Sequence, residues 1–197
     1  MNKIVNTIFG HGRGWVFSTN DFIAIATRSN IRISLHRLTN AGTIRRINRG
    51  LYEYPRKNQY TNSLMSPNPE QVAQALARKF RWQINPSGQT ALNFLGLSTQ
   101  LPSQYIYLSD GPNRVFKWDG GKLILKHAKR KDIVKISSKS SLIVSAIKEL
   151  GKDRIDNKIL SILRAGLSEN EKKALLKETK FITGWVYDIL EKICGDK

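Results

Sequence analysis

The chain has 197 residues, of which 40% are hydrophobic and 9% aromatic, so it can bury a core in one sizeable domain or two small ones. No apolar run is long enough to span a bilayer, the first residues do not resemble a signal peptide, and a single cysteine, Cys194, excludes an intrachain disulfide and a cysteine-based zinc site. Lys and Arg total 33 against 15 Asp and Glu, and the net charge of +18 indicates a polyanionic partner, nucleic acid before an anionic membrane or an acidic protein. We therefore expect a cytoplasmic protein without a membrane partner.

The positive charge is concentrated in the first two thirds of the chain. Residues 1–60 contain 10 basic and 2 acidic residues, residues 61–135 contain 11 and 4, and residues 136–197 contain 12 and 9. No block of like charges is long enough to form a disordered basic tail. We expect the charge to be carried by folded segments.

Three short helices are predicted in the first 42 residues. Apolar spacing predicts a helix over residues 2–10, and Ser18 with Asp21 resembles a capping box that opens a second helix. A third helix begins at Ser29 and is terminated by Gly42.

The third helix separates an apolar face from a basic one, since successive residues turn by ~100°. The apolar face contains Ile31, Leu35 and Leu38. The opposite face contains Arg32, Ile33, His36, Arg37 and Asn40. An arginine can bind guanine through two hydrogen bonds, and an isoleucine can contact a thymine methyl group. We interpret this face as a DNA-reading surface.

The next segment, "TIRRINRGLYEYP", predicts a two-stranded hairpin with its turn near Asn48–Gly50. Three helices followed by a basic hairpin are typical of a winged helix-turn-helix, in which the third helix enters the major groove. Three arginines of this wing are expected to face phosphates: Arg45, Arg46 and Arg49. Three apolar or aromatic residues are expected to hold the wing to the core: Leu51, Tyr52 and Tyr54.

The remaining sequence predicts a second domain. Polar and proline-rich residues at 58–69 are interpreted as a linker between a winged helix-turn-helix at 1–57 and a mixed domain at 70–197. Strand and hairpin patterns, including a turn at Asp119–Gly120, give way to helical spacing over residues 140–197. The predicted fold class is α+β, with the winged helix-turn-helix first and a helical segment last.

Signals for catalysis are weak. The three histidines have no metal-binding spacing, and no phosphate-binding loop, dinucleotide-binding glycine pattern or nucleophile elbow is present. Asp110, Asp119 and Lys122 invite comparison with metal-dependent nucleases, but a turn role explains Asp119 better. We predict that the protein is not an enzyme and that it uses no metal or cofactor.

Three stretches resemble the AbiEi-type (abortive infection) antitoxin family of type IV toxin–antitoxin systems. They are "GWVFSTNDF", "SLHRLTNAGTIRRINRGLYEYP" and "TALNFLGLSTQLPSQYIYLSDGPNR", and the resemblance covers roughly residues 10–130. It implies an N-terminal winged helix that represses its own promoter by binding inverted repeats. It also implies a second domain that counteracts a nucleotidyltransferase-like toxin, with or without stable contact between the two proteins.

The resemblance implies DNA-facing residues on the helix and on the wing. Those on the helix are Arg28, Ser29, Asn30, Arg32, Ile33, His36 and Arg37. Those on the wing are Arg45, Arg46, Asn48 and Arg49.

Two alternatives stay open on the sequence. One is a nucleic-acid-processing enzyme, with Asp110, Asp119 and Lys122 as the remnant of a metal site, or else a DNA- or RNA-binding regulator unrelated to a toxin. The other is an interaction module whose positive charge binds an acidic toxin surface. A neighbouring reading frame for a nucleotidyltransferase-like protein would favour the antitoxin.

Overall fold

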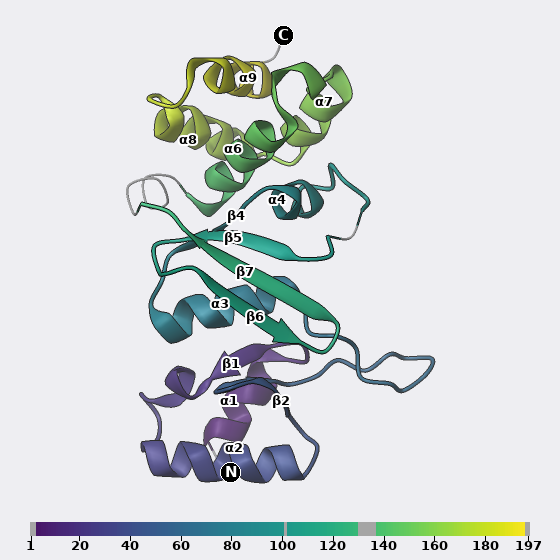
Figure 1. The fold of residues 1–197 in the computed structure, drawn as a ribbon, viewed down its shortest axis with the longest axis vertical. Coiled ribbons are helices and arrows are strands. Elements are labelled where there is room, and N and C mark those ends of the chain that lie inside the picture. Colours follow the sequence, from purple (N-terminus) through teal and green to yellow (C-terminus); the bar gives the residue numbers. More distant parts are fainter. Residues whose placement is uncertain (1–2, 101, 130–136, 196–197) are drawn as a thin grey trace. The chain divides into compact units, whose positions relative to one another are not determined.

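The computed structural model describes residues 3–100, 102–129 and 137–195, and it has a mixed α+β fold (Figure 1). The chain divides into two compact units. The first contains Met1–Trp82 together with Val115–Leu123, and the second contains Gln83–Arg114 together with Ile124–Lys197. No helix in the described ranges has both the length and the apolar character needed to cross a membrane.

The first unit opens with the winged-helix order of elements. They are α1 (Lys3–His11), β1 (Val16–Ser18), the 3-10 turn η1 (Thr19–Phe22), α2 (Arg28–Asn40), β2 (Arg45–Asn48) and β3 (Leu51–Glu53). The three strands form an antiparallel sheet in the order β1-β3-β2. This confirms the first and third predicted helices and the hairpin, whereas the strand β1 was not predicted.

The local capping signals in this region are only partly as predicted. The Ser18–Asp21 capping box forms, with the Ser18 N–H donating to Asp21 Oδ2 at 2.7 Å, but it opens a single 3-10 turn rather than an α-helix. The prediction that α2 starts at Ser29 is wrong, since Thr27 is its N-cap and its Oγ1 accepts from the Asn30 N–H. Ser29 lies inside the first turn, where its side chain is exposed.

The core of this region lies between the helices and the sheet. Its fully buried members are Ile4, Ile8, Phe17, Phe22, Ile31, Leu35 and Ile44. Tyr52 and Tyr54 pack against this cluster as predicted, and Leu51 is buried with 1% of its surface exposed. Burial of each large apolar side chain contributes about 1.5–3 kcal/mol, so the apolar face of α2 orients the whole helix.

Helix α3 (Pro69–Phe80) belongs to the first unit, which differs from the expected boundary at residues 58–69. Asn68 caps the helix, Pro69 fits its first turn, and the helix packs on β1 and η1. Arg78 fastens it by an ion pair to Asp21 at 2.7 Å and a hydrogen bond to the carbonyl of Val16 at 2.8 Å. These contacts join residues far apart in the sequence, which explains why composition alone placed the boundary before α3.

The second sheet has four strands in the order β4-β5-β7-β6. They are β4 (Ile84–Pro86), β5 (Tyr105–Ser109), β6 (Arg114–Trp118) and β7 (Gly121–His127), and the short helix α4 (Gln89–Phe94) lies between β4 and β5 in the sequence. The predicted turn at Asp119–Gly120 is confirmed, and Gly120 adopts the positive φ of 83° that such a turn requires.

The chain ends in helices, as expected for residues 140–197. They are α6 (Ser138–Leu150), the 3-10 turn η2 (Lys152–Arg154), α7 (Asn157–Ala165), α8 (Glu169–Thr179) and α9 (Gly184–Cys194). Their aliphatic side chains form a separate core that includes Ile147, Leu175 and Leu190. A capping box of Ser168 and Glu171 starts α8.

Candidate nucleic-acid interface

The outer face of α2 is a basic surface of the winged helix. All seven helix residues named from the sequence are exposed: Arg28, Ser29, Asn30, Arg32, Ile33, His36 and Arg37. The apolar face is turned inward, with Ile31 and Leu35 each only 1% exposed. In Figure 1, α2 lies at the lower edge of the first unit.

This face has the form of a ridge between two hollows. One hollow, of about 660 Å³, is lined by Arg28, Ser29, Arg32, Ile33, His36, Arg37 and Tyr52. The other, of about 410 Å³, is lined by Lys3, Ile4, Ile25, Ala26, Asn30, Ile33, Ser34 and Arg37. Ile33 and Arg37 line both hollows, so they form the crest of the ridge. Ile33 is 47% exposed, so it offers an apolar contact on a charged surface.

The cations on the ridge have no acidic partners. In the part of the chain that the structure describes, no carboxylate pairs with Arg28, Arg32 or Arg37. His36 lies against Asn40 on the same helix, with their nitrogen atoms 3.2 Å apart. Unpaired guanidinium groups retain donors for phosphate or for base edges. The arrangement is therefore suited to a polyanion.

The wing residues divide into two groups. Arg46 and Arg49 are exposed, as the sequence predicted. Asn48 is occupied within the protein, since its Nδ2 donates to the carbonyl of Lys117 at 3.1 Å and its Oδ1 accepts from the Arg49 N–H at 2.7 Å. Lys79 donates to the carbonyl of Arg49 at 2.7 Å. These contacts hold the turn of the wing in place, so Asn48 positions the wing rather than presenting its amide.

Arg45 also differs from the expectation that it faces phosphates. Its Nε donates to Glu53 Oε2 at 2.6 Å, and its Nη2 donates to the carbonyl of Met65. Glu53 is completely buried, and this burial raises the pKa of its carboxyl group although Arg45 acts in the opposite direction. The two residues are paired across β2 and β3. The opposite charges at facing positions of a predicted hairpin were a signal for this pair.

The segment between β3 and α3 is a structured projection rather than the predicted linker. Lys57 and Leu64 form a β-bridge, and Asn58 accepts from the N–H groups of Tyr60 and Thr61 at 2.8 and 3.2 Å. Figure 1 shows this segment extending from the first unit, and its Tyr60 is 96% exposed. We call residues 56–65 the projecting hairpin. It contains Arg56 and Lys57 but no acidic residue.

The residues considered for a metal-dependent nuclease have local structural contacts. Asp110 Oδ1 accepts from the Gln83 N–H at 2.9 Å, and Asp119 lies in the β6–β7 turn. Among the described residues, no group of three His, Cys, Asp or Glu is placed to hold a metal ion. Each aspartate therefore has a structural explanation of its own.

Comparison with known proteins places the chain in a family through most of its length. The profile of DUF6088, a family of unknown function, matches residues 3–175. The chain belongs to the DUF6088 family. The DUF6088 match runs from α1 into α8, so it includes α2, the wing, the projecting hairpin and the four-stranded sheet. No curated protein matches the chain.

Proposed function

We propose that this DUF6088 protein is a cytoplasmic DNA-binding transcriptional repressor that binds its own promoter and acts as the antitoxin of a toxin–antitoxin system. The observation that carries the proposal of DNA binding is the ridge on α2, where exposed arginines without acidic partners flank an exposed isoleucine. The helix has 13 residues, or about 20 Å, a suitable length for the major groove.

Base recognition would come from the ridge. Arg32 and Arg37 can each donate two hydrogen bonds to guanine, Asn30 can bind adenine, and Ile33 can contact a thymine methyl group. The first turn of α2 contains no acidic residue that would repel DNA. This combination favours sequence-specific binding over attraction by charge alone.

Phosphate contacts would come from the edges of the ridge. Arg46 and Arg49 are exposed on the wing, and Lys57 is exposed on the projecting hairpin. Such contacts position a protein on the duplex without reading its sequence. Arg45 and Asn48 would support this surface from within, through the contacts that hold the wing.

The antitoxin role is supported by the resemblance of residues 10–130 to AbiEi-type antitoxins. Those proteins bind inverted repeats in their promoters and counteract a nucleotidyltransferase-like toxin. On this basis, the winged helix represses transcription and the second unit neutralises the toxin.

DNA binding can be tested by fluorescence anisotropy with the DNA upstream of the gene and with a random duplex of equal length. Arg32→Ala and Arg37→Ala should each cost about 1–3 kcal/mol on the upstream DNA, and less on random DNA. Lys173→Ala, an exposed cation on α8, is the matched control for the lost charge. Equal losses on both duplexes would make the two arginines phosphate contacts. If the unchanged chain bound the upstream DNA no more tightly than the random duplex, autorepression would be contradicted.

The antitoxin role requires a separate test. Co-expression with the nucleotidyltransferase-like protein of the same locus should restore growth when the full chain is present. Failure to restore growth, with DNA binding intact, would leave a repressor unrelated to a toxin. Rescue by direct binding of the toxin without any DNA binding would favour the interaction module instead.

A further inference from the structure

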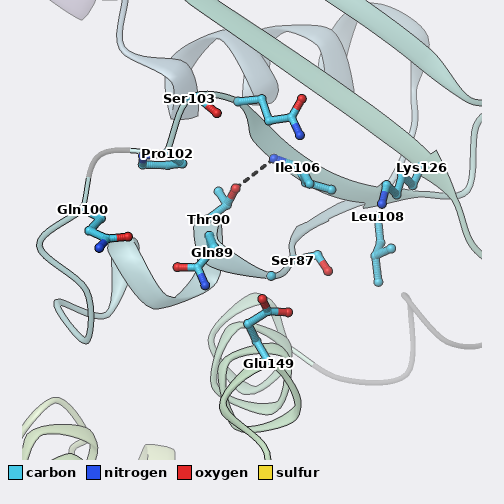
Figure 2. A pocket seen from close by; sticks show the side chains of 12 residues that line it. Ser87, Gln89, Thr90, Gln100, Pro102, Ser103, Ile106, Leu108, Lys126 and Glu149 are labelled. Carbon is cyan, nitrogen blue, oxygen red and sulfur yellow. Dashed lines mark hydrogen bonds between the residues drawn. The ribbon is translucent and has the colours of Figure 1, made fainter.

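The second unit contains a hollow of about 700 Å³, lined by both polar and apolar groups, that the proposed DNA binding does not use (Figure 2). It is lined by Ser87, Gly88, Gln89, Thr90, Gln100, Pro102, Ser103, Gln104, Ile106, Leu108, Lys126 and Glu149. Its volume lies within the usual range for small-molecule sites. Most of these lining residues belong to "TALNFLGLSTQLPSQYIYLSDGPNR", a stretch that lies outside the winged helix.

The walls of the hollow are held by a hydrogen bond from the backbone to a side chain and by the backbone conformation of Gly88. Thr90 Oγ1 accepts from the Ile106 N–H at 2.8 Å and so connects α4 with β5 (Figure 2). Gly88 has φ 60° and ψ −139°, a conformation that residues with a side chain rarely adopt. Gly88 and Glu149 lie side by side in the lining, since a Cβ atom at Gly88 would be 3.5 Å from Glu149 Oε2, an ordinary van der Waals contact.

The charged groups of the hollow have no partner of their own. Among the described residues, no hydrogen bond or ion pair involves the Lys126 ammonium or the Glu149 carboxylate. In Figure 2, Lys126 and Gln100 lie toward opposite ends, while Glu149 faces Ser87 and Gln89 between them. The hollow therefore presents a cation, then a carboxylate, then amide groups.

We propose that this hollow binds a mononucleotide. Lys126 would hold the phosphate as a point charge, and Glu149 would accept hydrogen bonds from the ribose hydroxyls, as acidic residues do in dinucleotide sites. The amides of Gln89, Gln100 and Gln104 offer the paired donors and acceptors that match a base edge. Ile106 and Leu108 provide an apolar wall for the base or the sugar. A ligand as small as an amino acid would leave most of the volume unfilled.

The test is calorimetric titration of the full chain with AMP, CMP, GMP and UMP, and with the matching nucleosides. At least one mononucleotide should bind. Lys126→Gln should weaken the nucleotide ~tenfold or more and leave the nucleoside unchanged, because only the phosphate contact is lost. Glu149→Gln should weaken nucleotide and nucleoside alike.

Two exposed residues outside the lining give matched controls: Lys129→Gln for the lysine and Glu191→Gln for the glutamate. Both control variants should bind as the unchanged chain does. Absence of binding by all four mononucleotides at millimolar concentration would overturn the proposal. So would binding that survives both Lys126→Gln and Glu149→Gln, or that is lost equally in the controls.

A free nucleotide and the terminal nucleotide of a strand present the same chemistry. Competition by a short single-stranded RNA that carries a terminal phosphate, with the same dependence on Lys126, would identify the end of a strand as the ligand. If the RNA does not compete while AMP or another mononucleotide binds, the ligand is the free nucleotide. Operator binding, measured in parallel, reports on the proposed repressor role independently of this hollow.

Discussion

The winged helix with α3 and the helical end of the chain differ in their balance of basic and acidic residues. Residues 1–82 contain 13 Lys and Arg but only three Asp and Glu, and two of those carboxylates, Asp21 and Glu53, are taken by Arg78 and Arg45. Residues 136–197 contain 12 basic and 9 acidic residues, with pairs such as Lys139–Glu171 at 2.8 Å. The number of cations is similar, and each region has two ion pairs among its described residues, so the difference lies in the number of carboxylates.

This comparison indicates which part of the total charge is available to a partner. A cation that faces a carboxylate on its own surface adds little to the field felt by a polyanion. The ridge on α2 keeps its arginines unpaired, whereas the carboxylates among the C-terminal helices offset most of the cations there. The net charge therefore indicated a nucleic-acid partner, but only the arginines without carboxylate partners on α2 identify the surface that would bind it.

The largest expected effect is on the free energy of unfolding, and it distinguishes the buried face of α2 from its exposed face. Leu35→Ala should lower the free energy of unfolding by about 2–5 kcal/mol, because it leaves a cavity beside Ile31 in the core. Ile33→Ala, on the exposed face, should change stability by less than about 0.5 kcal/mol and weaken operator binding instead. Urea unfolding and anisotropy measure the two effects. A large loss of stability in Ile33→Ala would show that this residue belongs to the core.

The second expected effect separates two neighbouring arginines of the wing. Arg45→Ala should lower the free energy of unfolding by roughly 3 kcal/mol, since it leaves the buried Glu53 without its cation. Arg46→Ala should have little effect on stability, because Arg46 is exposed. Urea unfolding of both variants is the measurement. Equal stability of the two variants would remove the positioning role assigned to Arg45.

The third expected effect concerns the salt dependence of DNA binding. Arg46→Ala, Arg49→Ala and Lys57→Ala should each reduce the slope of log K against log salt by about one, on operator and random DNA alike. Lys173→Ala in α8 should leave the slope unchanged. Titrations at several salt concentrations measure it. An unchanged slope in Lys57→Ala would exclude the projecting hairpin from the interface.

The smallest expected effect lies in the helical end. Ser168→Ala should lower the free energy of unfolding by about 1 kcal/mol, because the capping box at the start of α8 is lost. Thermal or urea unfolding at neutral pH measures this change. Ser161→Ala, an exposed serine inside α7, is a control that should change stability less.

The same capping box predicts a dependence on pH. Hydrogen bonds from Lys139 and from Ser168 lower the pKa of Glu171 from 4.5 to about 2. Because the folded pKa is the lower one, the stabilisation by Glu171 is present above pH 4.5 and is lost as the pH falls toward 2. Glu171→Gln should therefore narrow the difference in stability between pH 5 and pH 2.5. An unchanged difference would contradict the role of this carboxylate.

Local patterns in the sequence were sufficient for much of the winged helix. The spacing of Ile31 and Leu35 predicted which side of α2 is buried, and the hairpin at residues 43–55 was predicted from its alternation and turn residues. The capping boxes at Ser18 and Ser168 were also predicted. These features depend on residues within one or two turns of each other, so their physical causes are present in a short window of sequence.

Only the tertiary structure decided the features that join distant residues. Arg78 meets Asp21 across 57 positions and brings α3 into the first unit, and Glu149 of α6 comes to face the bare Gly88. Arg45 of β2 also donates to the carbonyl of Met65, at the end of the projecting hairpin. Charge and composition are the same whether or not such pairs form. The sequence by itself thus determined most of the elements and the sign of the charge, and the packing of those elements decided which charges stayed free.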